Sequence, residues 1–285
     1  MIDFEPKHEF LVGIDSDGCA FDTMEVKHKE CFIPNIIRYY DLASVSKYAR
    51  EAAEFVNLYS KWRGINRFPA LLMAFDLLRE RPEVQRRGVK VPTLPKVLEW
   101  TEKETKLGNP ALKKAVDESG DPELKHCLEW SEAVNQTVGD VVHHVPPFPN
   151  VKECLERLAE VADILVVSAT PNEALEREWT EHGLDKYIQR ICGQEAGTKK
   201  ETLELAKKYP KGNAIMLGDA PGDAKAAEAN NVLFFPILPG QEEESWQRFH
   251  LEGISRFLDG SYAGGYEEKL FAEFDACLPD SPPWN

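Results

Sequence analysis

The chain has 285 residues, of which 42% are hydrophobic and 29% charged, and its formal net charge is −15. At roughly 150 residues per domain this length predicts about two domains, with enough apolar residues for a sizeable core. Because an acidic surface repels phosphodiester backbones and anionic lipid, the charge argues against a nucleic-acid-binding or membrane-surface protein.

The apolar runs and the cysteines set further limits on location. The longest runs, such as residues 10–14 and 232–238, fall far short of the roughly 18 residues of a membrane span. The N-terminus lacks the basic start and apolar stretch of a signal peptide. Six scattered cysteines without a Cys-x-x-Cys pair predict reduced thiols rather than a zinc site or a disulfide scaffold. We therefore expect a cytoplasmic protein.

The first half of the chain contains one predicted strand and a long helical segment. Residues 10–14 form a short apolar run, which predicts a buried strand. About 120 residues without a strand pattern follow, and apolar residues recur at helical spacing in stretches such as 51–59, 70–78 and 122–138. The segment closes with Pro146-Pro147-Phe148-Pro149, which predicts a stiff extended linker.

The second half alternates between strand-like and helix-like segments. Strands are predicted at 163–168, 188–193, 213–218 and 232–237, and helical patterns lie between them. This alternation predicts βαβ units, and short continuous apolar strands are typical of a parallel sheet with helices on both faces. We expect an α/β protein with a Rossmann-like parallel sheet core and an inserted all-helical domain. The predicted segments are 1–22 with 146–240 for the core, 23–145 for the insertion, and 241–285 for a C-terminal helical extension packed on the core.

Acidic residues follow the first predicted strand. Asp15 and Asp17 lie two residues apart, directly after the buried run. Carboxylates crowded in this way need a cation or a shared proton, and their hard oxygen ligands suit Mg²⁺. The alternative is an ordinary turn with solvated acids, because Asp and Gly are common turn residues.

A second polar cluster, Ser168-Ala169-Thr170-Pro171, follows the strand expected at 163–168. Thr170 and Glu173 have the spacing of a capping box, and Pro171 suits a first helical turn. The free N–H groups of that helix start and the Ser168 hydroxyl would form a small cradle for an anion. The alternative is an ordinary strand-to-helix turn.

A third cluster, around Lys199 and Lys200, begins a predicted helix. Either lysine could neutralise a phosphate and a carboxylate together; we favour Lys199, because Leu203 and Ala206 then share its helical face. The alternative for either lysine is a solvated surface position.

The last cluster follows the strand predicted at 213–218. Asp219 stands at the tip of that strand and Asp223 follows four residues later. Asp219 is the better candidate metal ligand, whereas Asp223 either assists it or simply favours a helix N-terminus.

These motifs together resemble those of the haloacid dehalogenase-like (HAD) hydrolase superfamily. The match consists of Asp15-x-Asp17-Gly18-x-x-x-Asp22, Ser168 after an apolar strand, a lysine before a helix, and Gly218-Asp219-x-x-x-Asp223, in that order. The helical insertion after the first motif is similar to the cap domain of many members. One departure is Cys19, which stands where members usually carry Thr; we expect a buried small residue there rather than a reactive thiol.

The resemblance implies a role for each motif residue. Asp15 would be the nucleophile that forms an aspartyl-phosphate, and Asp17 the general acid and then base. Lys199 would neutralise the phosphoryl group and the nucleophile, while Ser168 and the Ala169 N–H would hold phosphate oxygens. The implied ligands of Mg²⁺ are Asp15, the Asp17 main-chain carbonyl, Asp219 and an assisting Asp223.

Asp17 also narrows the expected reaction. The dehalogenases of the superfamily lack an acid at this position, whereas phosphatases and phosphomutases carry one. The sequence is therefore interpreted as a Mg²⁺-dependent hydrolase of a small phosphate monoester, with a small phosphorylated metabolite as its partner. Two alternatives stay open: a phosphomutase or phosphotransferase of the same superfamily, and a non-catalytic phosphometabolite-binding protein. The sequence makes no prediction of oligomeric state.

Substrate choice is expected to lie in the inserted segment, because the core would read only phosphate. Residues 61–68 combine cations with aromatic residues. They either contact an anionic or sugar-like substrate or, as we favour, supply cations that complement a helix dipole. His143 and His144 precede the proline linker, and a hinge role for them is a hypothesis only.

Overall fold

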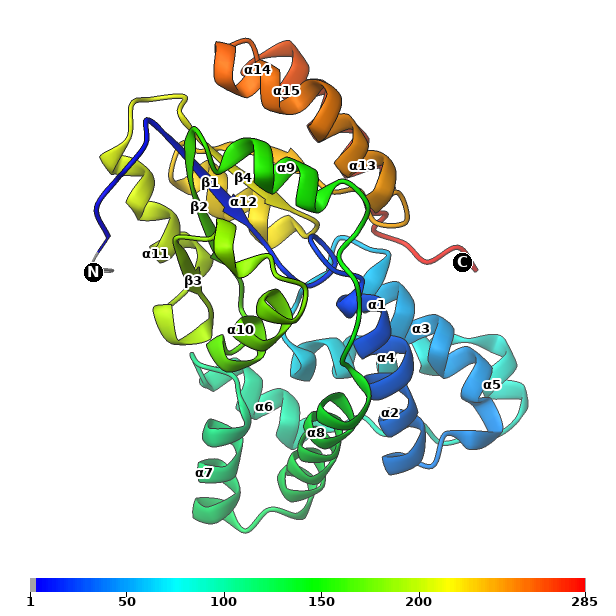
Figure 1. Cartoon of the computed structure of the whole chain (residues 1–285). Coiled ribbons are helices and arrows are strands. Elements are labelled where there is room, and N and C mark those ends of the chain that lie inside the picture. The colour runs from blue at the N-terminus through cyan, green and yellow to red at the C-terminus, as the bar shows by residue number, and fades with distance from the viewer. Residues whose placement is uncertain (1–3, 285) are drawn as a thin grey trace. The chain divides into compact units, whose positions relative to one another are not determined.

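The computed structural model describes residues 4–284, which divide into two compact units (Figure 1). The sheet unit comprises the chain up to Met24 together with His144–Pro279. The helical unit comprises Glu25–His143 and the residues from Asp280 onward. The chain therefore leaves and re-enters each unit, and it passes from one to the other at three points.

The sheet unit is built on five parallel strands in the order β3-β2-β1-β4-β5. Their bounds are Phe10–Ile14 for β1, Ala162–Val167 for β2, Arg190–Cys192 for β3, Ala214–Gly218 for β4 and Leu233–Pro236 for β5. Four of them lie at or within the predicted segments, whereas β2 begins one residue before the predicted 163–168; β3 is the most shortened. The first strand occupies the centre of a sheet whose other members come from beyond residue 160. The predicted α/β fold with a Rossmann-like parallel sheet is confirmed.

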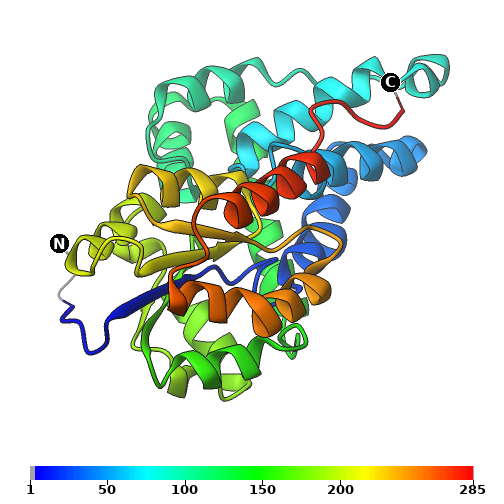
Figure 2. The same ribbon diagram turned by 90° about the horizontal axis from the view of Figure 1, so that it is seen from above.

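Helices cover both faces of this sheet, as Figure 2 shows. Alternate strand residues point to opposite faces: Val12 and Ile14 join one buried cluster, and Leu11 joins the other. The first cluster takes residues from α9 (Val151–Leu158), α10 (Asn172–Glu181), α13 (Glu242–Arg248) and α14 (Ile254–Asp259). The second takes residues from α11 (Lys199–Leu203), α12 (Pro221–Ala229) and α15 (Gly265–Cys277). Burial on both sides explains why the strands are continuously apolar.

The C-terminal helices are part of the hydrophobic core of the sheet unit. Trp246 is fully buried and its indole Nε1 donates to the carbonyl of Cys19 at 2.7 Å. Tyr262 is also fully buried and donates to the carbonyl of Phe234 in β5 at 2.7 Å. A π-helical stretch, Phe249–Gly253, lies between α13 and α14. Cys19 itself is buried, and burial raises the pKa of its thiol.

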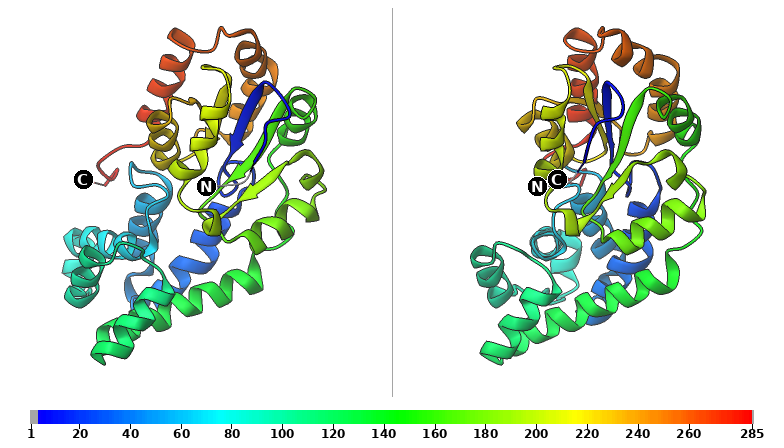
Figure 3. Two further views of the ribbon diagram at one scale, coloured as in Figure 1. Left: turned by 90° about the vertical axis from the view of Figure 1, so that its left-hand side faces the viewer. Right: turned by 60° about the vertical axis from the view of Figure 1, so that its left-hand side comes forward.

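The helical unit has no strand among its described residues (Figure 3). Its helices are α2 (Ile33–Tyr39), α3 (Ser46–Leu58), α4 (Arg67–Glu80), α5 (Pro82–Arg86), α6 (Pro95–Lys103), α7 (Asn109–Ser119) and α8 (Pro122–Val141). The short α1 (Thr23–Val26) and a π-helical segment, Lys27–Phe32, precede α2. One apolar cluster, which includes Phe68 and Trp130, holds these helices together.

The end of the chain packs within the helical unit. The ring of Trp284 lies 5.7 Å from that of Phe55, and the Arg81 guanidinium lies 4.3 Å from the Trp284 ring. Asp280 pairs with Lys61 at 3.0 Å. These contacts attach residues 280–284 to the helical unit, although the preceding helix α15 belongs to the sheet unit.

None of the described helices combines the length and the apolar character that a membrane crossing would require. None of the six cysteines, all of which lie within the described residues, forms a disulfide bond, and only Cys277 is partly exposed.

A buried carboxylate fixes the start of the chain to the sheet unit. Asp163 in β2 is fully buried and accepts hydrogen bonds from the N–H groups of Lys7 and His8, at 2.9 and 3.2 Å, and from the Tyr209 hydroxyl at 2.7 Å. Burial alone would raise the pKa of Asp163, but these hydrogen bonds hold it below its ordinary value.

Replacing this carboxylate by an amide is expected to destabilise the protein. In Asp163→Asn, urea unfolding at pH 7 should show a free energy of unfolding lower by about 2–3 kcal/mol, because hydrogen bonds to a buried charge are lost. Tyr209→Phe removes one donor and should cost about 1 kcal/mol. Since the folded pKa of Asp163 is depressed, its contribution is present above the unfolded pKa and disappears as pH falls through the folded pKa. Equal stability of wild type and Asp163→Asn at pH 7 would contradict this assignment.

Candidate functional site

The carboxyl edge of the sheet brings residues from distant parts of the chain together. Strands β1 and β4 pair in parallel, with Ile14 opposite Leu217, so that the residues after both strands meet at one edge. The Asp15 N–H donates to the Leu217 carbonyl at 3.0 Å and extends this pairing by one residue. Asp15 and Asp219 are thereby placed side by side, although they are far apart in the sequence.

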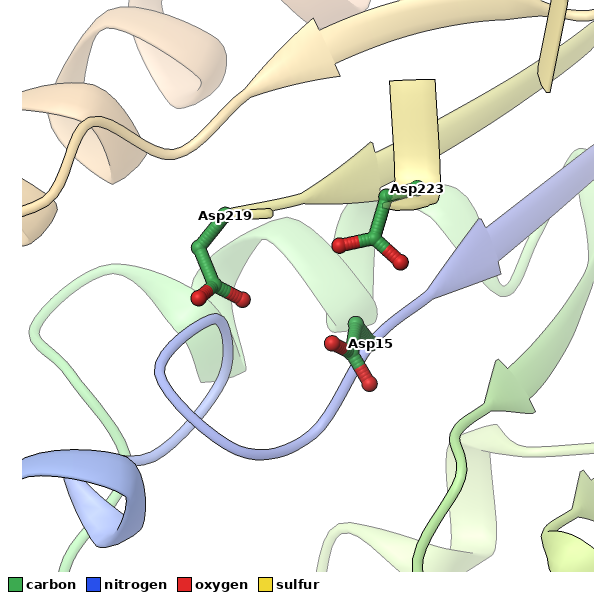
Figure 4. Close-up of side chains that lie close together, drawn as sticks. All are labelled: Asp15, Asp219 and Asp223. Carbon is green, nitrogen blue, oxygen red and sulfur yellow. The ribbon is translucent and has the colours of Figure 1, made fainter. Parts of the chain in front are cut away.

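Three carboxylates converge at this edge. Asp15, Asp219 and Asp223 expose only 5%, 1% and 0% of their surface, and each offers an oxygen within 4.8 Å of the others. Figure 4 shows the three side chains directed toward one another, Asp15 and Asp219 from the residues just after β1 and β4, and Asp223 from α12. Gly218 permits this approach, because a Cβ atom there would lie 2.5 Å from the carboxyl carbon of Asp223.

Asp223 has both of the roles that its sequence context suggests. Its Oδ2 accepts from the Ala220 N–H at 3.1 Å at the start of α12, as a residue favouring a helix N-terminus does. Its Oδ1 faces Lys199, whose Nζ lies 2.6 Å away. The carboxylate therefore fixes the helix start and at the same time belongs to the acidic cluster.

Lys199 is the lysine that contacts the carboxylates. Its Nζ lies 2.7 Å from Asp15 Oδ2 as well as 2.6 Å from Asp223 Oδ1, whereas Lys200 is exposed. Thr198 caps α11 and forms a capping box with Glu201, so Lys199 is fixed in the first turn of that helix.

The electrostatics of this cluster favour a divalent cation. With every group ionised, the three carboxylates and the Lys199 ammonium group together carry a net charge of −2 in a buried space. Burial raises the pKa of Asp15 to about 6; Lys199 opposes this and Asp223 adds to it. Burial also raises the pKa of Asp223. Burial would lower the pKa of Lys199, but the two neighbouring carboxylates outweigh it and raise that pKa, so the ammonium form persists. Hard oxygen donors with this excess charge fit Mg²⁺.

Two hydroxyl groups hold the carboxylate of Asp17. Thr170 donates to Oδ2 at 2.7 Å, and Thr23 donates to Oδ1. The predicted capping box of Thr170 with Glu173 is wrong: Pro171 is the N-cap, with ψ of 143°, and α10 begins at Asn172. The physical reason is that the Thr170 hydroxyl is engaged by a carboxylate from another strand end. No local sequence pattern indicated that Thr23 or Thr170 would contact Asp17.

Ser168 is linked to Asp17 by hydrogen bonds that both involve Thr170. Ser168 is buried, its N–H donates to the Cys192 carbonyl at 3.0 Å, and its hydroxyl accepts from the Thr170 N–H at 3.2 Å. Ala169 follows and is exposed. Within residues 4–284, direct hydrogen bonds or ion pairs connect Lys199 to Asp15 and Asp223, while Ser168 is connected to Asp17 by way of Thr170.

A second network that sequence reasoning missed supports the loop between the two acids. Ser16 is fully buried; its hydroxyl donates to Glu178 Oε2 at 2.7 Å and accepts from the Trp179 indole at 3.0 Å. The Ser16 carbonyl accepts from the N–H groups of Ala20 and Phe21. In the sequence, Ser16 is only a serine between two acids. Its hydrogen-bond partners lie more than 160 residues away, so no local pattern indicated them.

The family was identified by comparison with known proteins. The family model described as haloacid dehalogenase-like hydrolase matches residues 95–237, just over half of the chain. The chain belongs to this family. The predicted resemblance is thus confirmed, although the matched region begins after the first acidic motif. The search of curated proteins found no match.

Several solved structures are similar to this haloacid dehalogenase-like hydrolase. A predicted phosphoglycolate phosphatase from Haemophilus somnus 129pt is 16% identical, with 81% of this chain and 86% of that chain covered and a TM-score of 0.44. A HAD-superfamily hydrolase of subfamily IA from Geobacter sulfurreducens PCA is 15% identical, with 81% and 88% covered and a TM-score of 0.41. A family hydrolase from Xanthomonas campestris is 13% identical, with 90% and 94% covered and a TM-score of 0.44.

Proposed function

We propose that this hydrolase cleaves small phosphate monoesters with Mg²⁺ and an aspartyl-phosphate intermediate. One observation carries the proposal: a buried Asp15 carboxylate has the Lys199 ammonium group at 2.7 Å and two further carboxylates beside it. A carboxylate attacks a phosphate dianion poorly because like charges repel. Cationic groups on both sides of Asp15 would remove that repulsion.

The chain's own residues would perform two successive transfers. Asp15 attacks phosphorus, and the bond between phosphorus and the leaving oxygen breaks while Asp17 gives that oxygen its proton. Asp17 then takes a proton from water, whose oxygen attacks the phosphorus of the aspartyl-phosphate. Inorganic phosphate leaves and Asp15 is regenerated. The hydroxyl groups of Thr23 and Thr170, which hold both Asp17 oxygens, would keep its carboxyl group in position for both proton transfers.

Other residues would bind Mg²⁺ and the phosphate group of the substrate. The ligands of Mg²⁺ would be Asp15, the main-chain carbonyl of Asp17 and Asp219, with Asp223 assisting chiefly through its ion pair with Lys199. When bound, Mg²⁺ supplies positive charge that offsets the charge of the phosphoryl group. Ser168 and the Ala169 N–H would hold phosphate oxygens. Six cysteines without a disulfide bond support a reducing, cytoplasmic setting.

A screen of phosphorylated metabolites tests the proposal. The full chain with Mg²⁺ is expected to release inorganic phosphate from at least one small monoester, and both free phosphate and rearranged phosphate esters should be measured. Isomerised ester without net phosphate release would instead identify a phosphomutase. Binding without turnover, for every ester tested and at saturating Mg²⁺, would contradict both the phosphatase and the phosphomutase hypotheses and favour a binding protein.

A further inference from the structure

The cations between α3 and α4 do not share one role. Arg63 Nη1 donates to the Leu58 carbonyl at 2.8 Å, at the C-terminal end of α3, where a cation complements the helix dipole. Lys61 pairs with Asp280. Arg67 differs because it occupies the first residue of α4, and a positive charge at a helix N-terminus opposes the dipole. The interpretation of this segment as dipole-complementing cations holds for Arg63 and is wrong for Arg67.

Arg67 is surrounded by neutral groups. Its Nη1 donates to the carbonyl of Ser131 at 3.3 Å, to the Ser131 hydroxyl at 3.1 Å and to Asn135 Oδ1 at 2.7 Å. Its guanidinium lies 4.7 Å from the ring centroid of Phe32, and the Ser131 hydroxyl donates to Asn109 Oδ1 at 2.5 Å. Across residues 4–284 no carboxylate pairs with Arg67, and all its hydrogen bonds to protein atoms come from Nη1.

An arginine without a counter-ion is unusual in a chain with a net charge of −15. Burial lowers the pKa of Arg67 to about 10, because no neighbouring carboxylate compensates for the lost solvation of the charge. Arg67 is half-buried, so its guanidinium keeps part of its contact with solvent while Nη1 is held by neutral groups. The guanidinium therefore retains both its positive charge and unused donors in a fork that matches carboxylate and phosphate oxygens.

The N-termini of two helices add positive electrostatic potential near Arg67. Arg67 opens the 14-residue α4 and Asn109 opens the 11-residue α7, and the two are linked because Asn66 Nδ2 donates to the Leu107 carbonyl at 3.1 Å. Neither helix has an acidic residue in its first turn, and Gly108 gives α7 no side-chain cap. Phe32 ends a π-helical segment, a feature that is frequent at functional sites.

We propose that Arg67, with Ser131, Asn135 and Asn109, forms a binding site for a small oxyanion, a carboxylate or phosphate group, in the helical unit. The anion supplies the counter-ion that the protein itself does not give to Arg67. The anion is a separate small molecule that acts as an effector, a role that rests on the proposed function.

A pair of matched charge substitutions tests the site. Asn135→Asp places a carboxylate against Arg67 as an internal counter-ion, whereas Gln136→Glu adds the same charge at the next, exposed residue of α8. The probe is inorganic sulfate, titrated into Mg²⁺-free protein while the Arg67 Nε–Hε signal is followed by NMR, with Arg67→Lys assigning the signal. Sulfate should shift the signal in wild type and in Gln136→Glu, and its affinity should be about tenfold lower in Asn135→Asp.

Two results would overturn the site: an Arg67 signal that sulfate does not move, or equal sulfate affinity in Asn135→Asp and Gln136→Glu. Thermal unfolding should show that Asn135→Asp folds, because the new charge forms an ion pair. The titration needs no turnover, so it stands even if the proposed phosphatase activity fails.

Kinetics test the effector role separately from binding. Sulfate should change aryl phosphate turnover in wild type and in Gln136→Glu but not in Asn135→Asp. An equal effect of sulfate on turnover in the two variants would overturn the effector role.

Discussion

Asp15→Asn is expected to abolish Mg²⁺-dependent phosphate release, with kcat lower by a factor on the order of 10⁴ or more. An amide nitrogen or oxygen cannot take the phosphoryl group as a carboxylate does, so no aspartyl-phosphate forms. The substitution nearly preserves shape, so the packing of β1 and its pairing with β4 should persist. Phosphate release from the best ester of the screen measures the effect.

The control for this variant is a carboxylate-to-amide change away from the site. Asp185 is an exposed residue of the same unit, and Asp185→Asn should retain wild-type turnover. Circular dichroism and thermal unfolding of both variants verify that they fold. Turnover in Asp15→Asn that equals wild type, with a folded protein, would remove Asp15 from the role of nucleophile.

The second large effect is expected for Lys199→Met, with kcat about 10²- to 10³-fold lower. The ammonium group lies within hydrogen-bond distance of both Asp15 and Asp223, so its loss leaves two buried carboxylates without their cation. Lys199 is the main influence that lowers the pKa of Asp15, so this pKa should rise further in the variant. More of the nucleophile is then protonated at neutral pH, and residual activity should increase with pH more steeply than in wild type.

Lys200→Met provides the matched control, because Lys200 is the adjacent residue, has the same side chain and is exposed. It should leave kcat and the pH–rate profile near wild type. A reversed order, with Lys200→Met inactive and Lys199→Met active, would contradict the assignment of Lys199, which rests on its contacts with Asp15 and Asp223.

The sequence was most informative where a local pattern decides the structure. Continuous apolar runs predicted strands buried on both faces, and each strand end carried a recognisable polar residue, which placed Asp15, Ser168 and Asp219 at one sheet edge. The choice of Lys199 over Lys200 followed from the position of Leu203 on the same helical face, and Leu203 is buried in the core. The catalytic and metal-binding roles of these residues stay predictions.

Contacts between distant segments could not be predicted from the sequence. Thr170 fits a capping box when only its neighbours are considered, but its hydroxyl contacts Asp17, 153 residues away. The polar partners of Ser16 and the neutral surroundings of Arg67 likewise depend on which helices pack together. Local rules cannot predict such pairings, because the competing partner is selected by tertiary structure.

The attachment of residues 280–284 to the helical unit has a consequence for dynamics. The Trp284 ring is held on Arg81 by a cation–π contact worth about 0.5–2 kcal/mol. A contact of this size is only one to a few times the thermal energy, so residues 280–284 should detach and re-attach locally while the helices that they pack against stay folded.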